Sequence, residues 1–480
     1  MKNEQIISIP NLCDARAKLT ENKITYSNIV INEETKKANK GRKYLVKTYG
    51  CQANVRDGEM IGGLLEAANF RKTENIKEAD IVIINTCAVR ENAEDKVFGE
   101  IGNLKSLKCK NKKKIFALCG CMALEPHIVD KVKETFPHIN LIFGTHEIPY
   151  FLSYVEELFN SDVSRIISVK SQAGEIVENL PSIRQDEFKA FVNIMYGCNK
   201  FCSYCIVPYT RGRERSRLAK DILQECRQLV DSGYQEITLL GQNVNAYGKD
   251  LKDGTSFALL LEEVAKMDIP RLRFVTSHPW DFSDELIDTI AKYPNIMKSI
   301  HLPLQSGNDD VLKKMGRRYS AREYLDLVAK MRNKMPSIAL STDIIVGFPN
   351  ETEEQFEDTL KIVDLVKYDF AFTFIYSPRP GTPAANLKDD VSKKEKHTRF
   401  KELVKKLEIS ILESSQKMIG NIYPVLVEGR SKNNPEMYSG YTESSKLVHF
   451  KAIPSDIGKI IKVKIVKAQT YSLQGEVVDG

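Results

Sequence analysis

The sequence lacks an apolar run long enough to cross a membrane. A membrane-spanning helix needs about 20 consecutive apolar residues, whereas the most apolar stretches here, Ile81–Ile84 and Ile115–Leu118, have only the length of a buried strand. The first ten residues, MKNEQIISIP, contain one lysine and no long apolar core, which is not the pattern of a secretory signal peptide. We therefore expect a cytoplasmic protein with no membrane association.

The sequence also lacks a second CxxC motif, although zinc sites usually pair two of them. Its ten cysteines should be mostly reduced in the cytoplasm, where clustered cysteines are more often metal ligands or catalytic groups than disulfides. The net charge of +6 permits a nucleic-acid partner without requiring one. A chain of 480 residues exceeds what one hydrophobic core supports, and it predicts about three domains.

The hydrophobic pattern divides this multidomain α/β chain into five segments. Residues 1–42 are polar and weakly periodic, which predicts a loosely ordered extension. Strands and helices alternate over 43–155, which predicts a small α/β domain with a parallel sheet. A polar linker with one short strand follows at 156–187. Six strands alternating with helices over 188–418 predict a partial (β/α)6 barrel, and the period-two pattern of 419–480 predicts a small antiparallel β-barrel.

The last predicted barrel is the part of the chain best suited to RNA. We expect its strands at Tyr423–Glu428, Leu447–Phe450, Ile460–Val466 and Gly475–Val478. Lys462 and Lys464 alternate with apolar residues, so both point to solvent, either as a phosphate track or as the outer face of an ordinary half-buried strand. Three aromatic residues either stack on bases or fill the barrel: Tyr438, Tyr441 and Phe450.

One cysteine motif lies just after the first strand of the central segment. Cys198, Cys202 and Cys205 form a CxxxCxxC, and three thiolates so close together can hold three irons of a 4Fe–4S cluster. The fourth iron is then open to a substrate or cofactor. A zinc site completed by a distant ligand is the alternative. The motif, with Tyr204 before its last cysteine, resembles the signature of the radical S-adenosylmethionine (SAM) superfamily, which makes these cysteines catalytic as well as metal-ligating.

The radical SAM resemblance also implies SAM contacts at the carboxyl ends of later barrel strands. Gly, Pro or small polar residues stand where four of these strands end, although a tight turn explains any one of them equally well. The residues that we expect to contact SAM are Gln242, Asn243, Ser277, Gln305, Ser306 and Gly347.

Three more cysteines follow the three predicted strands of the N-terminal domain. Cys51, Cys87 and Cys121 each stand at the carboxyl end of a parallel strand, so all three should lie along one edge of the sheet. They form a second three-iron ligand set with one open position. Plain packing is the alternative, and it is the interpretation that we favour for Cys226, which falls within a predicted helix.

The residues around these cysteines resemble the radical SAM methylthiotransferase family. The resemblance is carried by Gly50–Asn54 (GCQAN), Asn85–Ala93 (NTCAVRENA), Gly120–Ala123 (GCMA) and Gly197–Arg217, and the last sixty residues resemble the RNA-binding TRAM domain. It implies two 4Fe–4S clusters, SAM, a tRNA partner, a flavodoxin- or ferredoxin-type electron donor and a monomer. One cluster would generate the radical and the other would hold the inserted sulfur.

The substrate differs between branches of this family. The residues after Cys51 and Cys87 are similar to the branch that acts on N6-isopentenyladenosine at position 37 of tRNA, apart from Ala53 and Leu124, where other residues are usual. The alternatives are threonylcarbamoyl-adenosine in tRNA or a ribosomal protein. Two rivals from other classes are a non-catalytic iron–sulfur protein that binds RNA and senses redox state, and a zinc-dependent RNA-binding module.

Four arginines follow the CxxxCxxC motif, at positions 211, 213, 215 and 217. Guanidinium groups suit phosphates and can stack on bases. A solvated run of charge is the simplest interpretation of such a segment by itself. Its place beside the motif favours a role in ordering the substrate, SAM or the loop.

Overall fold

The computed structural model describes residues 3–15, 23–27, 29, 31–88, 91–171, 175–432 and 434–478. The chain forms two compact units. The first contains residues 1–185, 193–201 and 205–221, and the second contains residues 186–192, 202–204 and 222–480. Within the described ranges, the helices are all too short or too polar to span a membrane.

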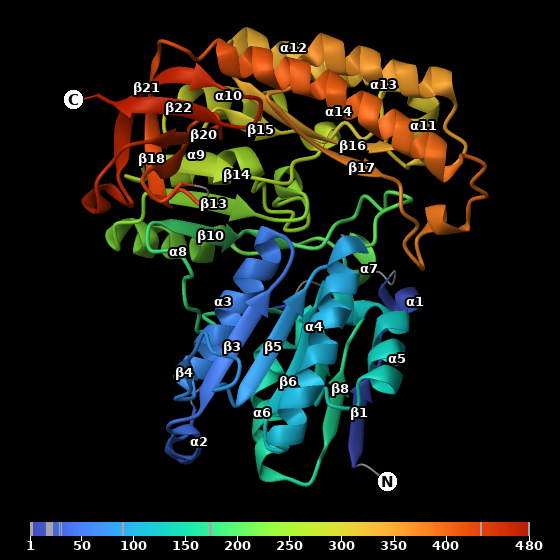
Figure 1. The fold of residues 1–480 in the computed structure, drawn as a ribbon, viewed down its shortest axis with the longest axis vertical. Coiled ribbons are helices and arrows are strands. Elements are labelled where there is room, and N and C mark those ends of the chain that lie inside the picture. Colours follow the sequence, from blue (N-terminus) through green and yellow to red (C-terminus); the bar gives the residue numbers. More distant parts are fainter. Residues whose placement is uncertain are drawn as a thin grey trace. The chain divides into compact units, whose positions relative to one another are not determined.

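A parallel sheet of seven strands is the centre of the first unit (Figure 1). Its order is β1-β8-β7-β6-β5-β3-β4. The strands are β1 (Glu4–Ser8), β3 (Lys43–Thr48), β4 (Arg71–Lys72), β5 (Ile81–Thr86), β6 (Ile115–Gly120), β7 (Leu141–Phe143) and β8 (Arg165–Ser168). Every residue of β5 and β6 is buried, as expected for parallel strands covered on both faces.

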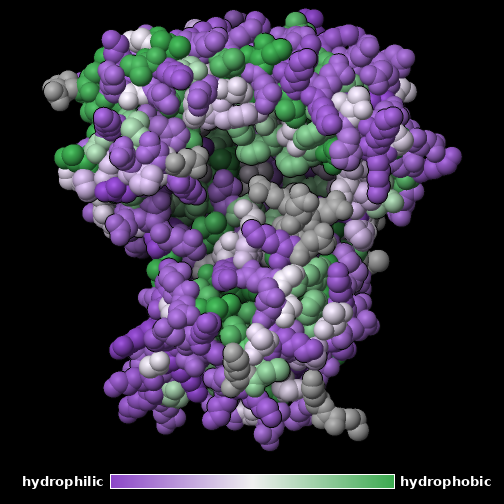
Figure 2. All heavy atoms as spheres, viewed as in Figure 1, coloured by the Kyte–Doolittle hydropathy of each residue, from purple (hydrophilic) through white to green (hydrophobic). Residues whose placement is uncertain are grey.

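Helices cover both faces of this sheet. They are α3 (Gln52–Ala67), α4 (Glu91–Lys110), α5 (Pro126–Thr135) and α6 (Phe151–Asn160). Ile81 and Ile83 of β5 belong to the apolar core that includes α3 and α6 residues, whereas Val82 and Ile84 belong to the core that includes α4 and α5 residues. Hydrophilic residues dominate the side of this unit displayed in Figure 2, because the apolar residues of the sheet are enclosed between the helices.

The N-terminal 42 residues differ from the loosely ordered extension that the sequence predicts. β1 pairs with β8 in parallel, β2 (Ile24–Tyr26) pairs with β9 (Ile176–Glu178), and the segment also contains α1 (Leu12–Ala15) and α2 (Glu33–Asn39). The predicted linker 156–187, in which the sequence predicts one short strand, contains β9 and also β8, whose four residues are all buried. The N-terminal strands β1 and β2 are short, and β1 is half exposed. Neither of these two strands has the apolar run by which a strand is recognised from sequence.

Six strands form the partial barrel of the second unit, in two three-stranded sheets. The first contains β10 (Lys189–Asn193), β13 (Glu236–Leu240) and β14 (Arg271–Phe274), and the second contains β15 (Ser299–His301), β16 (Ala339–Val346) and β17 (Phe370–Ile375). The connecting helices are α8 (Ala219–Asp231), α9 (Phe257–Ala265), α10 (Asp284–Lys292), α11 (Asp309–Lys314), α12 (Ala321–Lys334) and α13 (Glu353–Val366). The predicted alternation of strands and helices is confirmed.

The C-terminal strands close into a small barrel, preceded by the long helix α14 (Lys393–Gln416). Its order is β18 (Ile422–Arg430), β19 (Tyr438–Thr442), β20 (Leu447–Phe450), β22 (Leu473–Val477) and β21 (Ile460–Ala468). The sequence did not predict β19, because its residues YSGYT contain no apolar run. One pair, β20 with β22, is parallel, whereas the sequence predicted antiparallel strands. Tyr438 and Phe450 are buried and fill the barrel, and Tyr441 is partly exposed.

We predict that Gly63→Ala destabilises the protein by about 1–3 kcal/mol, the usual cost of forcing a group into a filled core. A Cβ at Gly63 in α3 would lie 2.4 Å from the backbone of Pro181. Gly99→Ala in α4 is the matched control, because a Cβ there meets nothing within 4 Å and alanine favours helix over glycine. Urea unfolding of both variants is the measurement. Equal stability of the two variants would contradict the close approach at Gly63.

Candidate functional site

Cys51, Cys87 and Cys121 lie at the carboxyl ends of three neighbouring strands. Cys51 follows β3 and caps α3, Cys87 follows β5, and Cys121 follows β6 and opens a short 3-10 helix. Gly50 adopts a φ of +122°, and a Cβ there would lie 2.3 Å from the Cβ of Cys87. Only glycine therefore permits this approach of the strand ends. The predicted common edge is confirmed, while the metal-ligand roles stay a prediction.

Two buried asparagines join the strand ends that carry these cysteines. The Asn54 amide donates to Asn85 Oδ1 at 3.2 Å and to the Thr86 carbonyl at 3.0 Å. The Asn85 amide donates back to the Asn54 carbonyl at 2.7 Å, and Cys51 Sγ donates to Asn54 Oδ1 at 3.3 Å. The asparagines of the GCQAN and NTC motifs therefore fix the positions of Cys51 and Cys87 relative to each other.

Arg211 contacts this cysteine set. Its Nε donates to Cys121 Sγ at 3.0 Å and its Nη2 donates to Asp57 Oδ2 at 2.6 Å, and both charged side chains are buried. Further along the segment, Arg217 forms a two-pronged ion pair with Glu178 at 2.7 Å. The interpretation of a solvated charge run is therefore wrong for these two arginines, which order the segment within the first unit.

The three thiols have different acidities. A hydrogen bond from Cys87 lowers the pKa of Cys51 to about 6, and the Arg211 charge assists. Burial raises the pKa of Cys121 to about 11, although Arg211 opposes this. Cys119 is buried in the core of the sheet, and Cys226 is buried in α8, which agrees with the packing role predicted for Cys226.

The CxxxCxxC segment crosses between the two units, since Cys198 and Cys205 belong to the first and Cys202 to the second. Within the first unit, Gly197 has a φ of +76° and leaves no room for a Cβ, which would lie 2.0 Å from the Arg213 carbonyl oxygen. Within the second unit, the buried Arg317 donates to Cys202 Sγ at 3.7 Å and to the Pro303 carbonyl at 3.0 Å.

A buried guanidinium therefore lies beside one predicted cluster ligand in each unit, at Cys121 and at Cys202. A nearby cation stabilises a thiolate relative to a thiol, and thiolates are the ligands that an iron–sulfur cluster requires. Each set supplies three thiols, the donor type that such a cluster takes, and the cluster-ligand roles stay a prediction. Groups of three His, Cys, Asp or Glu side chains that could hold a single metal ion are absent from the described residues. No local sequence pattern predicts the contact of Arg317, which lies 115 residues from Cys202.

The six residues predicted to contact SAM lie at the carboxyl ends of β13 to β16, but they are not equally available. The Ser277 hydroxyl donates to the His301 carbonyl, the Ser306 hydroxyl lies 3.5 Å from that of Thr359, and the Asn243 amide donates to Asp281 at 2.7 Å. In Gln305, the buried Oε1 has no hydrogen-bond partner among the residues that the structure describes. Gln242 is partly buried after β13, and its contact with SAM stays a prediction.

Two strand ends adopt a left-handed backbone without glycine. Thr276 has a φ of +68° and Gln305 a φ of +71°, and the left-handed region is costly for such residues, above all for a β-branched one. Strain of this kind is concentrated at functional sites, which agrees with a binding role for these two turns.

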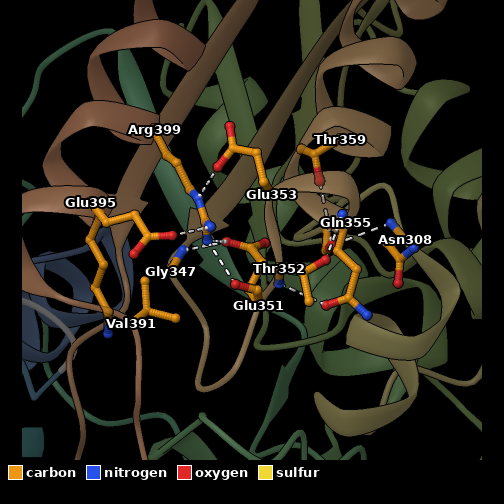
Figure 3. Close-up of polar contacts among 12 residues, drawn as sticks. Asn308, Gly347, Glu351, Thr352, Glu353, Gln355, Thr359, Val391, Glu395 and Arg399 are labelled. Carbon is orange, nitrogen blue, oxygen red and sulfur yellow. Dashed lines mark hydrogen bonds and ion pairs between the residues drawn. The ribbon is translucent and has the colours of Figure 1, made fainter.

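Gly347 is held by a polar network that Figure 3 shows at the end of β16. Its N–H donates to Glu351 Oε2 at 2.7 Å, and Arg399 of α14 donates to the Glu351 carbonyl at 2.8 Å and to Glu353 at 3.0 Å. The Thr352 side chain and Gln355 complete a capping box that opens α13. A Cβ at Gly347 would lie 2.5 Å from Lys396, so α14 packs directly on this turn.

We predict that Arg211→Gln costs about 3–5 kcal/mol of folding stability, because it leaves the Asp57 carboxylate buried without a counter-charge. Adding Asp57→Asn should restore part of this loss. Arg322→Gln is the matched control, since its ion pair with Asp326 is exposed and such pairs contribute about 0–1 kcal/mol. Urea unfolding of the three variants tests the pair, and a loss from Arg211→Gln no larger than that of the control would refute it.

Burial raises the pKa of Glu351 to about 7, although the Gly347 N–H and Arg399 oppose this. The folded chain therefore binds a proton here that the unfolded chain, with the ordinary pKa of 4.5, has already lost. The resulting stabilisation is complete below pH 4.5 and is lost as the pH rises through 7. Glu351→Gln keeps an acceptor for Gly347, so its melting temperature should fall less than that of the wild type between pH 5 and 8. Parallel pH profiles would contradict this assignment.

Comparison with known proteins identifies three segments of the chain. Residues 43–144 match the Uncharacterized protein family UPF0004, residues 192–363 match the Radical SAM superfamily, and residues 416–478 match the TRAM domain. Among solved structures, the radical S-adenosylmethionine methyltransferase TsrM from Kitasatospora setae is similar in fold, with a TM-score of 0.52 and 14% identity over 72% of this chain and 75% of that one.

Curated proteins match along nearly the whole chain. The tRNA-2-methylthio-N(6)-dimethylallyladenosine synthase of Oceanobacillus iheyensis is 52% identical over 98% of this chain and 91% of its own length. The proteins of the same name from Staphylococcus epidermidis and Bacillus subtilis are 50% and 49% identical, over 98% and 99% of this chain and 92% and 93% of their own lengths. The chain therefore belongs to the radical SAM methylthiotransferase family, in the branch of the tRNA-2-methylthio-N(6)-dimethylallyladenosine synthases.

Proposed function

We propose that this enzyme inserts a methylthio group at carbon 2 of N6-dimethylallyladenosine, at position 37 beside the anticodon of tRNA. The observation that carries the proposal is the set of three cysteines at the carboxyl ends of β3, β5 and β6, in a chain that also carries the CxxxCxxC motif. The identity of about half of all residues to relatives with this activity in their names supports the same substrate.

Membership of the radical SAM superfamily implies SAM and one 4Fe–4S cluster. In our proposal, Cys198, Cys202 and Cys205 hold this cluster, which supplies the one-electron cleavage of SAM to a radical. A radical is required because the hydrogen on carbon 2 of adenine is not acidic and its bond is strong. The chain's own residues orient the reactants: Arg317 keeps Cys202 in place, and the unpartnered Gln305 Oε1 accepts a hydrogen bond from SAM.

We also assign a second 4Fe–4S cluster to Cys51, Cys87 and Cys121, as the site where the inserted sulfur is held. Asn54 and Asn85 fix the strand ends, and Arg211 donates to Cys121, which disperses negative charge on that sulfur. The Asp57 carboxylate in turn fixes the guanidinium. These residues position the ligands and do not themselves react.

The C-terminal barrel supports tRNA binding. Lys462 and Lys464 are both exposed on β21, whereas Val463 and Ile465 of the same strand are buried. The predicted alternation is therefore confirmed, and the lysines present a row of charge that suits phosphates. An anticodon loop is a favourable target, because unpaired bases can be splayed out and read by proteins. Electrons would come from a flavodoxin- or ferredoxin-type donor.

Iron and sulfide counts after purification without oxygen test the two-cluster assignment. We expect about eight irons for the wild type, and about four both for a Cys51/Cys87/Cys121→Ala variant and for a Cys198/Cys202/Cys205→Ala variant, because each set of three thiolates holds one four-iron cluster. Both variants should fail to produce the 2-methylthio nucleoside from prenylated tRNA, as measured by mass spectrometry. A wild type with about four irons would remove the second cluster, and with it the proposed sulfur insertion.

A further inference from the structure

Three phenylalanines are exposed side by side on β17 of the second unit. Phe370, Phe372 and Phe374 are 38%, 45% and 41% exposed. Alternate residues of a strand point to one face, and the rings of Phe370 and Phe372 lie 4.9 Å apart. A contiguous row of large apolar side chains in water is unfavourable, and such patches mark binding surfaces.

The phenylalanines lie on the face of the β15-β16-β17 sheet that the helices leave open. The other face is covered by α12 and α14 (Figure 1). The Tyr324 hydroxyl of α12 donates to the Leu302 carbonyl, and the Ser410 hydroxyl of α14 donates to the Tyr368 carbonyl. On β16, Ser341, Asp343 and Ile345 stand in register with the three phenylalanines. Their side chains are partly exposed, whereas the residues between them are buried.

Three polar side chains, His301, Asp343 and Ser341, form a cluster on this face. His301 Nε2 lies 3.3 Å from Asp343 Oδ2, and its Nδ1 lies 3.0 Å from Ser341 Oγ. The His301 ring also meets the ring of Phe372 edge to face, with centroids 6.0 Å apart. A carboxylate and an imidazole, both partly exposed, therefore stand next to the middle of the phenylalanine row.

The same face continues directly into the turn that we assign to SAM. The Gln305 N–H donates to the Asp343 carbonyl at 2.8 Å, and the Ile345 N–H donates to the Gln305 carbonyl at 3.0 Å. Gln305 thus pairs with β16 between the two residues whose side chains flank Phe372 and Phe374. A ligand that covers the phenylalanines therefore lies on the same sheet as the strained Gln305 turn, which follows β15.

We propose that Phe370, Phe372 and Phe374, with His301 and Asp343, bind the prenylated adenine itself. This assignment rests on the proposed function. Aromatic rings offer a stacking surface to the purine and an apolar surface to the dimethylallyl tail. The Asp343 carboxylate accepts a hydrogen bond from the one hydrogen that prenylation leaves on N6.

This arrangement also selects against the other modified adenosine that we considered. A threonylcarbamoyl group carries a carboxylate, which would lie against apolar rings and beside the negative charge of Asp343. Like charges in a partly buried site repel, and apolar rings offer a carboxylate no hydrogen bond. The phenylalanine face therefore determines specificity for an uncharged, apolar substituent on N6.

Binding of two synthetic anticodon stem-loop RNAs tests this assignment. One carries N6-dimethylallyladenosine at position 37 and the other carries adenosine there, and affinity is measured by fluorescence anisotropy with the iron-loaded enzyme and SAM. The wild type should bind the prenylated RNA more tightly. Phe372→Ala and Phe374→Ala should each weaken its binding on the order of tenfold, and should weaken binding of the unmodified RNA less, because unmodified adenosine loses only the stacking contact and not the contact with the prenyl group. Iron content and melting temperature show that each variant is folded.

Leu365→Ala is the matched control, because Leu365 is 63% exposed on α13 and lies outside the proposed face. It should bind both RNAs as the wild type does. Unchanged affinities in both phenylalanine variants would overturn the assignment, and so would an equal loss for both RNAs, which would show that the rings do not contact the prenyl group. Methylthiolation of the prenylated RNA by the wild type would then leave the proposed function standing. A wild type that does not modify this RNA would instead refute the proposed function.

Discussion

The parallel pairing of strands is the constraint on which both units depend. Parallel strands end at a common edge, where their backbone groups lose their partners and the chain turns into a helix. In the first unit this edge carries Cys51, Cys87 and Cys121, and in the second it carries the turns with Thr276, Gln305 and Gly347. The same geometric rule therefore collects residues from distant parts of the sequence twice in one chain.

Buried charge is used in a similar way in the two units. Arg211 and Arg317 each place a guanidinium beside one cysteine sulfur, and each is fixed by other partners, Asp57 in one case and Pro303 and Tyr319 in the other. A buried charge is costly unless it is paired. In the proposed function this cost is offset by the interaction of each guanidinium with a cysteine sulfur.

The open face of the β15-β16-β17 sheet shows the reverse arrangement, in which apolar side chains are left in contact with water. Helices cover the opposite face, where Tyr324 and Ser410 bond to the strand ends. A face with three phenylalanines is retained in an exposed position when a ligand covers it during function. The proposed prenyl-adenine site and the sulfur-holding site thus have opposite chemical character, one apolar and one charged, as their different ligands require.

The sequence by itself determined most of the fold and the identity of the cysteine sets. Long buried strands such as β5 and β6 and amphipathic helices have strong periodic patterns, and the spacing of Cys198, Cys202 and Cys205 has few other interpretations. Short or half-exposed strands such as β1 and β19 were not predicted, because their stabilisation comes from neighbours in the sheet and leaves no apolar run. Only the tertiary structure decided that Arg211 and Arg317 lie beside cysteine sulfurs. It also decided which face of β17 stays open, and that Ser306 bonds within the fold while Gln305 Oε1 has no hydrogen-bond partner among the described residues. These are contacts between residues far apart in the chain, and local sequence carries no record of which distant side chain completes them.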